Sequence, residues 1–322
     1  MLQRKGVSPD YRRQGVPIVF FYLLLWVQIS TIMRTIEPSE LIINPDGSIF
    51  HLHLRPNDIA GTILLVGDPG RVDTVASFFD RIEFSTSNRE FKTTTGWFRG
   101  KRLSVVSTGI GTDNIDIVVN ELDALFNIDF ATRQEKKDKQ QLTLIRLGTS
   151  GAIQADIPID SFVLTETAIG FDGLLNFYEG RNEVSNLDME AAFLAHTQWN
   201  PLCAKPYFVS SSESLVARFE DIAIKGITIS APGFYGPQGR VLRIPLATSD
   251  INKRIESFRY NNRMITNFEM ESSAINGLSK LLGHNSITIC AIIANRVTKE
   301  SSPAYKPTVK KLIEIVLNRL LQ

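Results

Sequence analysis

Three short apolar segments, each followed by a glycine-containing turn, constrain the fold of this chain more than any other feature. They are Thr62–Val66 before Gly67-Asp68-Pro69-Gly70, Arg102–Ser107 before Thr108-Gly109-Ile110-Gly111, and Leu142–Leu147 before Gly148-Thr149-Ser150-Gly151. Apolar runs of this length between turns are typical of buried strands. In α/β sheets, ligands collect where the strands end, and backbone N–H groups there are natural anion ligands. Because Arg71 and Arg146 lie beside two of these turns, the sequence favours a phosphate site.

The rest of the chain alternates short apolar runs with amphipathic stretches, which predicts an α/β fold. Further strands are expected over Ser161–Thr167 and Ser286–Ile293, and helices over Arg71–Phe79 and from about Asp113 as the N-cap. A C-terminal helix is predicted to bury one apolar face, formed by Val309, Leu312, Ile313, Val316 and Leu320. We interpret Arg133–Gln141 as a solvated charged loop and residues 179–225 as helices with irregular links. No repeat or linker divides the chain, so we expect one domain.

The composition excludes several classes of function. The chain has 322 residues, of which 43% are hydrophobic and 21% charged, and this balance is typical of a globular protein with a sizeable core. A net charge of +1 gives no reason to expect nucleic acid as a partner. The two cysteines, Cys203 and Cys290, and the four histidines have no metal-binding spacing. We therefore expect no metal site, no disulfide framework and a cytoplasmic location.

Residues 1–32 differ from the rest of the chain. Pro17 to Val27 is strongly apolar and follows basic residues, which give residues 1–32 a net charge of +3. The run is shorter than the roughly 20 residues that a membrane-spanning helix needs, and no convincing cleavage site follows it. Two interpretations stay open: the natural start is Met33, or the segment is a signal peptide or membrane anchor. We divide the chain into a leader, residues 1–32, and one folded domain, residues 33–322.

Eight motifs follow one another along the chain: Phe50-His51-Leu52, Val66-Gly67-Asp68-Pro69-Gly70-Arg71-Val72, Asn88-Arg89-Glu90-Phe91, Ser107-Thr108-Gly109-Ile110-Gly111, Arg146-Leu147-Gly148-Thr149-Ser150-Gly151-Ala152-Ile153-Gln154, Phe234-Tyr235-Gly236-Pro237-Gln238-Gly239-Arg240, Asn267-Phe268-Glu269-Met270-Glu271-Ser272 and Asn295-Arg296-Val297. Together they resemble the nucleoside phosphorylase family, most of all its bacterial uridine phosphorylases, from about Ser48 to the C-terminus. The resemblance implies a single-domain three-layer α/β/α fold with a central mixed sheet. It also implies phosphorolysis of a pyrimidine nucleoside, in which uridine and phosphate give uracil and ribose 1-phosphate in nucleoside salvage or catabolism. Inorganic phosphate would be a co-substrate, and no cofactor is implied.

The resemblance also assigns the groups that would hold phosphate. The family's phosphate ligands match the Gly67 backbone, Arg71, Arg146 and the hydroxyl of Thr149. Arg89 matches an arginine that reaches in from a neighbouring subunit. Guanidinium groups suit this task because they bind oxyanions through paired, charge-assisted hydrogen bonds. For an isolated arginine, a surface ion pair would be the simpler interpretation.

A second group of residues matches the family's ribose site. Glu271 matches the carboxylate that binds the 2′- and 3′-hydroxyls, and Met270 packs beneath the sugar. His51 matches a histidine that contacts the 5′-hydroxyl across a subunit interface, although a lone histidine is usually structural. A carboxylate also stabilises the positive charge that develops on the sugar. We expect three catalytic residues: Glu271 at the sugar, Arg146 at the phosphate, and Arg240, whose match to the base site is described next.

The residues expected at the base determine the subclass. Purine-specific members of the family carry an aspartate that protonates the leaving purine, and this chain has Asn295 at that place. An amide cannot act as a general acid. Gln238 and Arg240 match the pair that binds the amide edge of uracil, and Phe234 would stack on its ring, unless Phe234 is a core aromatic.

The resemblance leaves several points open. The family's interface potassium site uses a carboxylate that matches Glu90 and a serine where this chain has Asn114, so we expect no metal, with a weak monovalent-cation site at Glu90 as the alternative. Since Arg89 and His51 would serve a neighbouring subunit, a homo-oligomer built from dimers, up to a hexamer, is implied. The competing functions are a purine nucleoside phosphorylase, a nucleosidase and a non-catalytic nucleoside-binding protein.

Overall fold

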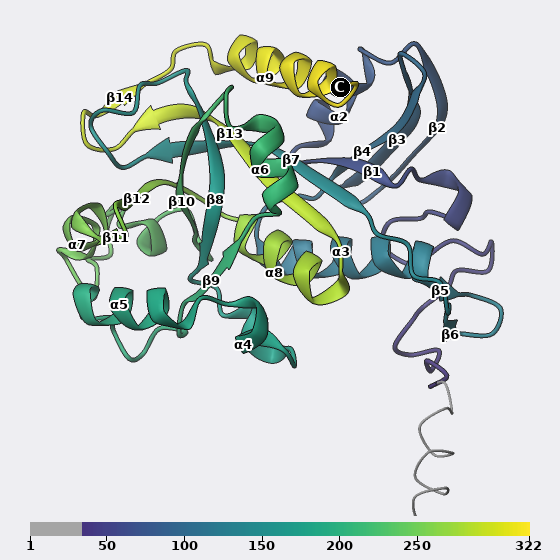
Figure 1. Ribbon diagram of the computed structural model, residues 1–322, viewed down its shortest axis with the longest axis horizontal. Coiled ribbons are helices and arrows are strands. Elements are labelled where there is room, and N and C mark those ends of the chain that lie inside the picture. Colours follow the sequence, from purple (N-terminus) through teal and green to yellow (C-terminus); the bar gives the residue numbers. More distant parts are fainter. Residues whose placement is uncertain (1–33) are drawn as a thin grey trace, which may run out of the picture.

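The structure is a computed structural model that describes residues 34–322, so the predicted leader lies outside the described residues (Figure 1). Twelve strands of this part of the chain form one mixed sheet. In sheet order they are β11 (Arg259–Tyr260), β12 (Arg263–Glu269), β10 (Ile224–Ser230), β8 (Phe162–Gly170), β13 (Asn285–Asn295), β7 (Thr143–Ala152), β1 (Thr62–Val66), β4 (Lys101–Ser107), β3 (Phe91–Phe98) and β2 (Arg81–Asn88), with β9 (Tyr207–Ser210) beside β8 and β14 (Glu300–Ser301) beside β13. The predicted central mixed sheet is confirmed.

One half of this sheet closes on itself. Strand β12 pairs with β10 on one side and with β7 on the other, so β7, β13, β8, β10 and β12 form a closed circuit. The closing pairs are Asn267 with Ala152 and Phe268 with Gly151, in antiparallel register. The strands β7, β1 and β4 are parallel to one another. Their carboxyl ends therefore lie together at one edge of the sheet, next to the closed half.

Helices cover both faces of the sheet, as Figure 1 shows. They are α2 (Pro69–Ala76), α3 (Thr112–Asn127), α4 (Arg181–Val184), α5 (Leu187–Thr197), α6 (Glu213–Phe219), α7 (Ile251–Ser257), α8 (Ser272–Leu282) and α9 (Tyr305–Arg319), with short turns η1 (Pro56–Asp58), η2 (Leu174–Phe177) and η3 (Gly236–Gln238). Helices α3 and α8 pack on one face, and α2, α6 and α9 on the other. This arrangement is the three-layer α/β/α fold that the sequence predicted. No helix of residues 34–322 is both long and apolar enough to cross a bilayer.

The periodicity of the apolar residues explains how the layers pack. Within β1, Ile63 and Leu65 face α3 and α8, whereas Leu64 and Val66 face α2 and α9, because successive strand residues point to opposite sides. The predicted apolar face of the C-terminal helix is buried as expected, from Val309 to Leu320. Both faces of the parallel central strands β13, β7, β1 and β4 are therefore covered, which is usual for parallel strands.

Several local predictions were wrong. The segment Gly148-Thr149-Ser150-Gly151 is not a turn, because β7 continues through it to Ala152, paired with β13. The first helix begins at Pro69 and ends at Ala76, and the N-cap of α3 is Gly111 instead of Asp113, which lies in the first turn.

Two segments that were predicted without strands contain them. Part of Arg133–Gln141 forms a small hairpin, in which β6 (Gln134–Glu135) pairs with β5 (Ile128–Asp129). The guanidinium of Arg133 binds the backbone carbonyls of Ile36, Glu37 and Leu41, so this residue anchors the N-terminal segment instead of being solvated. Residues 179–225 hold the predicted helices, but also β9 and the start of β10.

Candidate active site

The turns that follow β1 and β4 lie against each other at the carboxyl edge of the sheet. The backbone N–H of Thr108 donates to the carbonyl of Val66 at 2.8 Å, and the backbone of Gly109 lies against Gly67. From the same turn, the N–H of Gly111 donates to Oε1 of Glu271 at 2.9 Å. The glycines predicted at the strand ends are therefore brought together with the carboxylate predicted to bind ribose.

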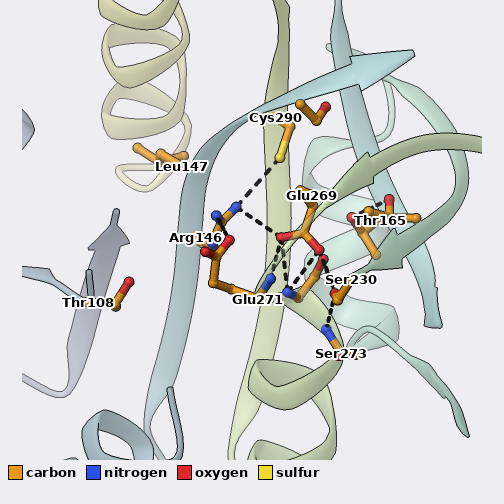
Figure 2. A network of polar contacts seen from close by, with 12 residues as sticks. Thr108, Arg146, Leu147, Thr165, Ser230, Glu269, Glu271, Ser273 and Cys290 are labelled. Atoms are coloured by element: carbon orange, nitrogen blue, oxygen red, sulfur yellow. Dashed lines mark hydrogen bonds and ion pairs between the residues drawn. The ribbon is translucent and has the colours of Figure 1, made fainter. Parts of the chain in front are cut away.

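Arg146 on β7 is the centre of this group. Its side chain is buried and forms ion pairs with two carboxylates, to Glu271 through Nη2 and to Glu269 through Nη1 at 3.3 Å. Nη1 also lies 3.6 Å from Sγ of Cys290. Figure 2 shows the guanidinium between the thiol and the two carboxylates. Within the described residues, Nε of Arg146 is buried without a hydrogen-bond partner, so this arginine retains a donor that a ligand could use.

Burial and charge act against each other in this group. Burial opposes the charged form of Arg146, but Glu271 and Glu269 outweigh it and raise the pKa of the guanidinium. Burial raises the pKa of the Glu271 carboxyl, and the positive charge of Arg146 opposes that shift. The arginine therefore stays charged in the interior, and a proton is easier to add to Glu271 than to an exposed glutamate.

Glu269 holds the start of α8 in place. Its carboxylate accepts hydrogen bonds from the backbone N–H groups of Glu271, at 2.9 Å, and of Ser272. The hydroxyl of Ser230, at the end of β10, donates to the same carboxylate. The first N–H groups of a helix lack partners within the helix, and a carboxylate there stabilises it. Glu269 therefore fixes the backbone from which Glu271 projects.

Gly148 leaves room for the arginine. A side chain at this position would overlap the guanidinium of Arg146, and its Cβ would lie 2.8 Å from Sγ of Cys290. The thiol of Cys290 is buried, and burial raises its pKa to about 12. Cys290 is thus a neutral neighbour of Arg146 at ordinary pH.

The second predicted phosphate arginine approaches the same strand from the other face of the sheet. Nη1 of Arg71, on α2, donates to the carbonyl of Leu147 at 3.2 Å, next to Arg146 in the chain. Burial lowers the pKa of Arg71, and the nearby charge of Arg146 lowers it further. Thr149 lies on the same strand and is partly exposed. Two cations held this close disfavour each other, which is the arrangement that an oxyanion between them would relieve.

The predicted base-binding residues form a second cluster around η3. Nη1 of Arg240 donates to Oε1 of Gln238 at 2.5 Å and to the carbonyl of Phe234 at 2.6 Å. The guanidinium lies 3.8 Å from the centre of the Phe234 ring, and 52% of this phenylalanine is exposed. Phe234 is therefore not a core aromatic, and its ring is stacked on Arg240.

Arg296 is a residue near this cluster to which the sequence analysis gave no role. Its side chain packs over Gly151 and lies 5.1 Å from the ring of Phe268. Burial lowers its pKa to about 10, and the charge of Arg240 adds to the shift. Among the described residues, its Nη1 is buried without a partner. An arginine directly after a buried strand in the Asn295-Arg296-Val297 motif was the signal that could have identified it.

Asn295, expected where purine-specific relatives carry an acid, has no free polar atom. Its amide nitrogen donates to the carbonyls of Gln154 and Ile157, both at 2.9 Å. Its oxygen accepts from the N–H groups of Val297, at 2.9 Å, and Thr298. Asn295 therefore shapes the turn after β13 and offers no group to a leaving base.

His51 and Arg89 lie on segments that contact each other, and in residues 34–322 neither side chain forms a hydrogen bond or ion pair with Arg146. Nδ1 of His51 is 2.6 Å from Oε1 of Glu121 on α3, which also binds the backbone N–H of His51. The side chain of Asn88, next to Arg89, donates to the His51 carbonyl at 2.8 Å. Arg89 is exposed, with a left-handed backbone (φ 54°), at the tip of the β2–β3 hairpin. Met270, which the sequence analysis expected beneath the sugar, is partly exposed and lies between Glu269 and Glu271 in the chain.

Among the residues that the structure describes, Glu90 belongs to no cluster of acidic, histidine and cysteine side chains suited to a metal. Within residues 34–322, no group of three histidine, cysteine or acidic side chains could hold an ion. The amide nitrogen of Asn114 lies 3.3 Å from the carbonyl of Ile110, to which it donates, on the same side of Gly109 as Glu90. The amide is therefore a built-in donor beside the position where the family resemblance placed a cation.

The match to known proteins agrees with this geometry. Residues 62–321 match the phosphorylase superfamily, and the chain belongs to this family. A uridine phosphorylase of Thermococcus kodakarensis is 30% identical, over 80% of this chain and 82% of the relative. A DeoD-type purine nucleoside phosphorylase of Brevibacillus brevis is 27% identical, over 84% and 98%. The crystal structure of a Trypanosoma brucei nucleoside phosphorylase, described as showing uridine phosphorylase activity, is 29% identical with a TM-score of 0.78, over 87% and 99%. The predicted family and fold are confirmed.

Proposed function

We propose that this chain is a nucleoside phosphorylase that cleaves uridine with inorganic phosphate. The observation that carries the proposal is the position of Arg146, which is buried between Glu271 and Glu269 with Arg71 bound to the next carbonyl of the same strand. A phosphate dianion and a sugar must meet at one point in phosphorolysis. Arg146, proposed for the phosphate, forms an ion pair with Glu271, proposed for the sugar, and Arg71 binds the Leu147 carbonyl beside them.

The proposed reaction uses these groups in one displacement. Arg71 and Arg146 hold phosphate beneath the anomeric carbon, with the backbone of Gly67 and the hydroxyl of Thr149 as further ligands. Glu271 accepts the ribose hydroxyls and stabilises the positive charge that develops on the sugar. The C1′–N1 bond breaks with its electron pair going to uracil, and a phosphate oxygen forms the new bond to C1′. Uracil leaves as an anion, and water protonates it.

The base cluster supports uracil over a purine. Gln238 offers a donor and an acceptor to the amide edge, and Arg240 offers charge-assisted donors to the departing anion. Arg296 adds a second cation at this end of the site. Asn295 cannot protonate a purine, because an amide is no acid and both of its polar atoms are already bound.

A direct assay tests the proposal. Purified protein is incubated with uridine, with and without phosphate, and uracil and ribose 1-phosphate are measured; inosine is the comparison substrate. We expect uracil release that requires phosphate, with much less base released from inosine. Equal turnover of inosine would reject the pyrimidine assignment, release without phosphate would indicate a nucleosidase, and no release would favour a nucleoside-binding protein.

We also infer that the active unit is a homo-oligomer built from dimers. Arg89 and His51 lie near each other, and within residues 34–322 neither forms a hydrogen bond or ion pair with Arg146 or Glu271, which suits residues that complete a neighbouring subunit's site. Light scattering combined with activity at increasing dilution tests this inference: a fully active monomer would contradict it. We also propose that the enzyme is cytoplasmic, as the spacing of its two cysteines suggested. We assign its activity to the domain formed by residues 33–322.

A further inference from the structure

A cavity lies between α2 and the first turns of α9. Its volume is about 500 Å³. Arg71 lines it from α2, and Tyr305, Lys306 and Lys310 line it from α9. The two lysines and Tyr305 are exposed, whereas Arg71 is partly buried, so the arginine lies deeper than the lysines. The cavity thus leads from solvent to an arginine that the proposed function places against phosphate.

The charges that line this cavity are unbalanced. Its three cations face one carboxylate, Asp68, and that carboxylate already accepts the N–H of Gly70 at 2.8 Å as the cap of α2. Within residues 34–322, neither Lys306 nor Lys310 forms an ion pair. Like charges at positions i and i+4 of a helix destabilise it. The arrangement costs stability unless an anion approaches it.

The position of Lys306 in α9 adds to this imbalance. Lys306 lies in the first turn of the helix, which has no acidic residue and no side-chain cap. The start of a helix carries partial positive charge, so a lysine there is unfavourable by itself. The apolar parts of Tyr305 and Val309 also line the cavity, and apolar walls focus the field of nearby charges.

The cavity reaches Arg71 from the α9 side of the sheet, whereas the Arg146–Glu271 pair lies beside Gly111 and the start of α8. An anion that comes through the cavity therefore meets Arg71 before it reaches the predicted ribose site.

We propose that this cavity is an access site for inorganic phosphate, in which Lys306 and Lys310 attract the oxyanion and deliver it to Arg71. The inference rests on the proposed function, since that function makes phosphate the co-substrate. It assigns to the two lysines a role in capture, separate from the chemistry at Arg146 and Glu271.

The test compares the double variant Lys306→Ala/Lys310→Ala with the parent at fixed low ionic strength. We expect kcat/KM for phosphate to fall about tenfold, which is within the range of electrostatic steering. The kcat at saturating phosphate and the KM for uridine should stay unchanged. The difference should shrink as salt is added, because at about 0.1 M the screening length is only about 10 Å. Lys311→Ala is the matched control, since Lys311 lies on the same helix but lines a different surface hollow.

A second measurement separates this inference from the proposed function. Stabilisation of the protein against heat by inorganic phosphate is recorded for the parent and the variants, and the double variant should require a higher phosphate concentration for the same shift. If the parent is active but the double variant matches it in both measurements, the access site is wrong and the function stands. If the parent shows no phosphorolysis yet loses phosphate stabilisation in the double variant, the function is wrong and the site stands.

Discussion

Arg146 on β7 pairs directly with Glu271 at the start of α8, so the group expected to hold phosphate neutralises the group expected to hold ribose. Both side chains are buried, where an unpaired charge is costly. Under the proposed function, Arg146 would bind phosphate and Glu271 would bind the ribose hydroxyls, so the ion pair between them would weaken as the substrates enter. The pair therefore keeps both buried charges partnered while the site is empty of substrate.

This pairing predicts opposite effects of Glu271→Gln on the two substrates. The amide cannot compete with phosphate for Arg146, so the KM for phosphate should fall, while the KM for uridine rises. Loss of a group that stabilises transition-state charge should lower kcat by on the order of 10²–10³. Steady-state kinetics with each substrate varied in turn provides the measurement. An increase in the KM for phosphate would show that the ion pair assists phosphate binding instead of competing with it.

The acid side of the pH profile should also reflect Glu271. Burial raises the pKa of this carboxyl above its ordinary value of 4.5, although Arg146 opposes the shift. Because only the ionised form carries the negative charge that binds both ribose hydroxyls strongly and stabilises the positive charge on the sugar, activity should be lost as the pH falls through that raised pKa. We expect the fall in kcat/KM for uridine to begin at a higher pH than for an exposed glutamate. A profile that stays flat down to pH 4.5 would contradict the assignment.

Arg240→Leu should reduce uridine turnover through kcat as well as KM. Negative charge on uracil is greatest in the transition state, and the removal of one donor to a developing anion costs on the order of 10²–10³ in kcat. The matched control is Arg243→Leu, because Arg243 is an exposed arginine of the same loop. If Arg240→Leu stayed within a few-fold of the parent, Arg240 would be a structural cation that holds Gln238 and Phe234.

Asn295→Asp should destabilise the protein without creating purine activity. The new carboxylate would face the carbonyls of Gln154 and Ile157 and leave both without their donor. Buried groups left unsatisfied cost about 1–3 kcal/mol each, so we expect a loss of about 3 kcal/mol in the free energy of unfolding. Denaturant unfolding measures it, with Asn285→Asp, at the more exposed start of β13, as the control. Strong inosine turnover by the variant would show that position 295 reaches the base.

The two cysteines should differ in reactivity. Cys203 is exposed, whereas Cys290 is buried beside Arg146, and burial raises the pKa of its thiol to about 12. Since the thiolate is the reactive form, a thiol reagent at neutral pH should modify one cysteine per native chain and two after unfolding. Cys203→Ser should leave no rapidly reacting thiol. Fast modification of that variant would mean that solvent reaches Arg146 from the Cys290 side.

The sequence predicted best what depends on local pattern and on motifs. The strand Thr62–Val66 and the apolar face of α9 were correct because burial imposes a period that the sequence displays. The motifs also identified Arg146 and Glu271, which the structure brings together from distant segments, and Gln238 and Arg240, which lie two residues apart in one loop. The roles of these groups came from the resemblance to the nucleoside phosphorylase family.

The errors have a common physical cause, which is contact between segments far apart in the chain. Gly148 and Gly151 were expected to form a turn, but their lack of side chains makes room for Arg146 and Arg296, and β13 and β12 hold the backbone extended. Strand β9 was not predicted, because a segment of only four residues can be recognised as a strand only from its pairing with β8. The free nitrogen of Arg296 likewise becomes evident only when Gly151 and Phe268 are placed around it.

The space above Gly148 has a consequence for the diversification of this family. Any side chain there would displace Arg146 and press on Cys290, so position 148 cannot drift while the arginine keeps its place. A larger residue at this position would therefore require the guanidinium of Arg146 to lie elsewhere. The residue at position 148 therefore indicates whether a related sequence has room for an arginine placed as Arg146 is here.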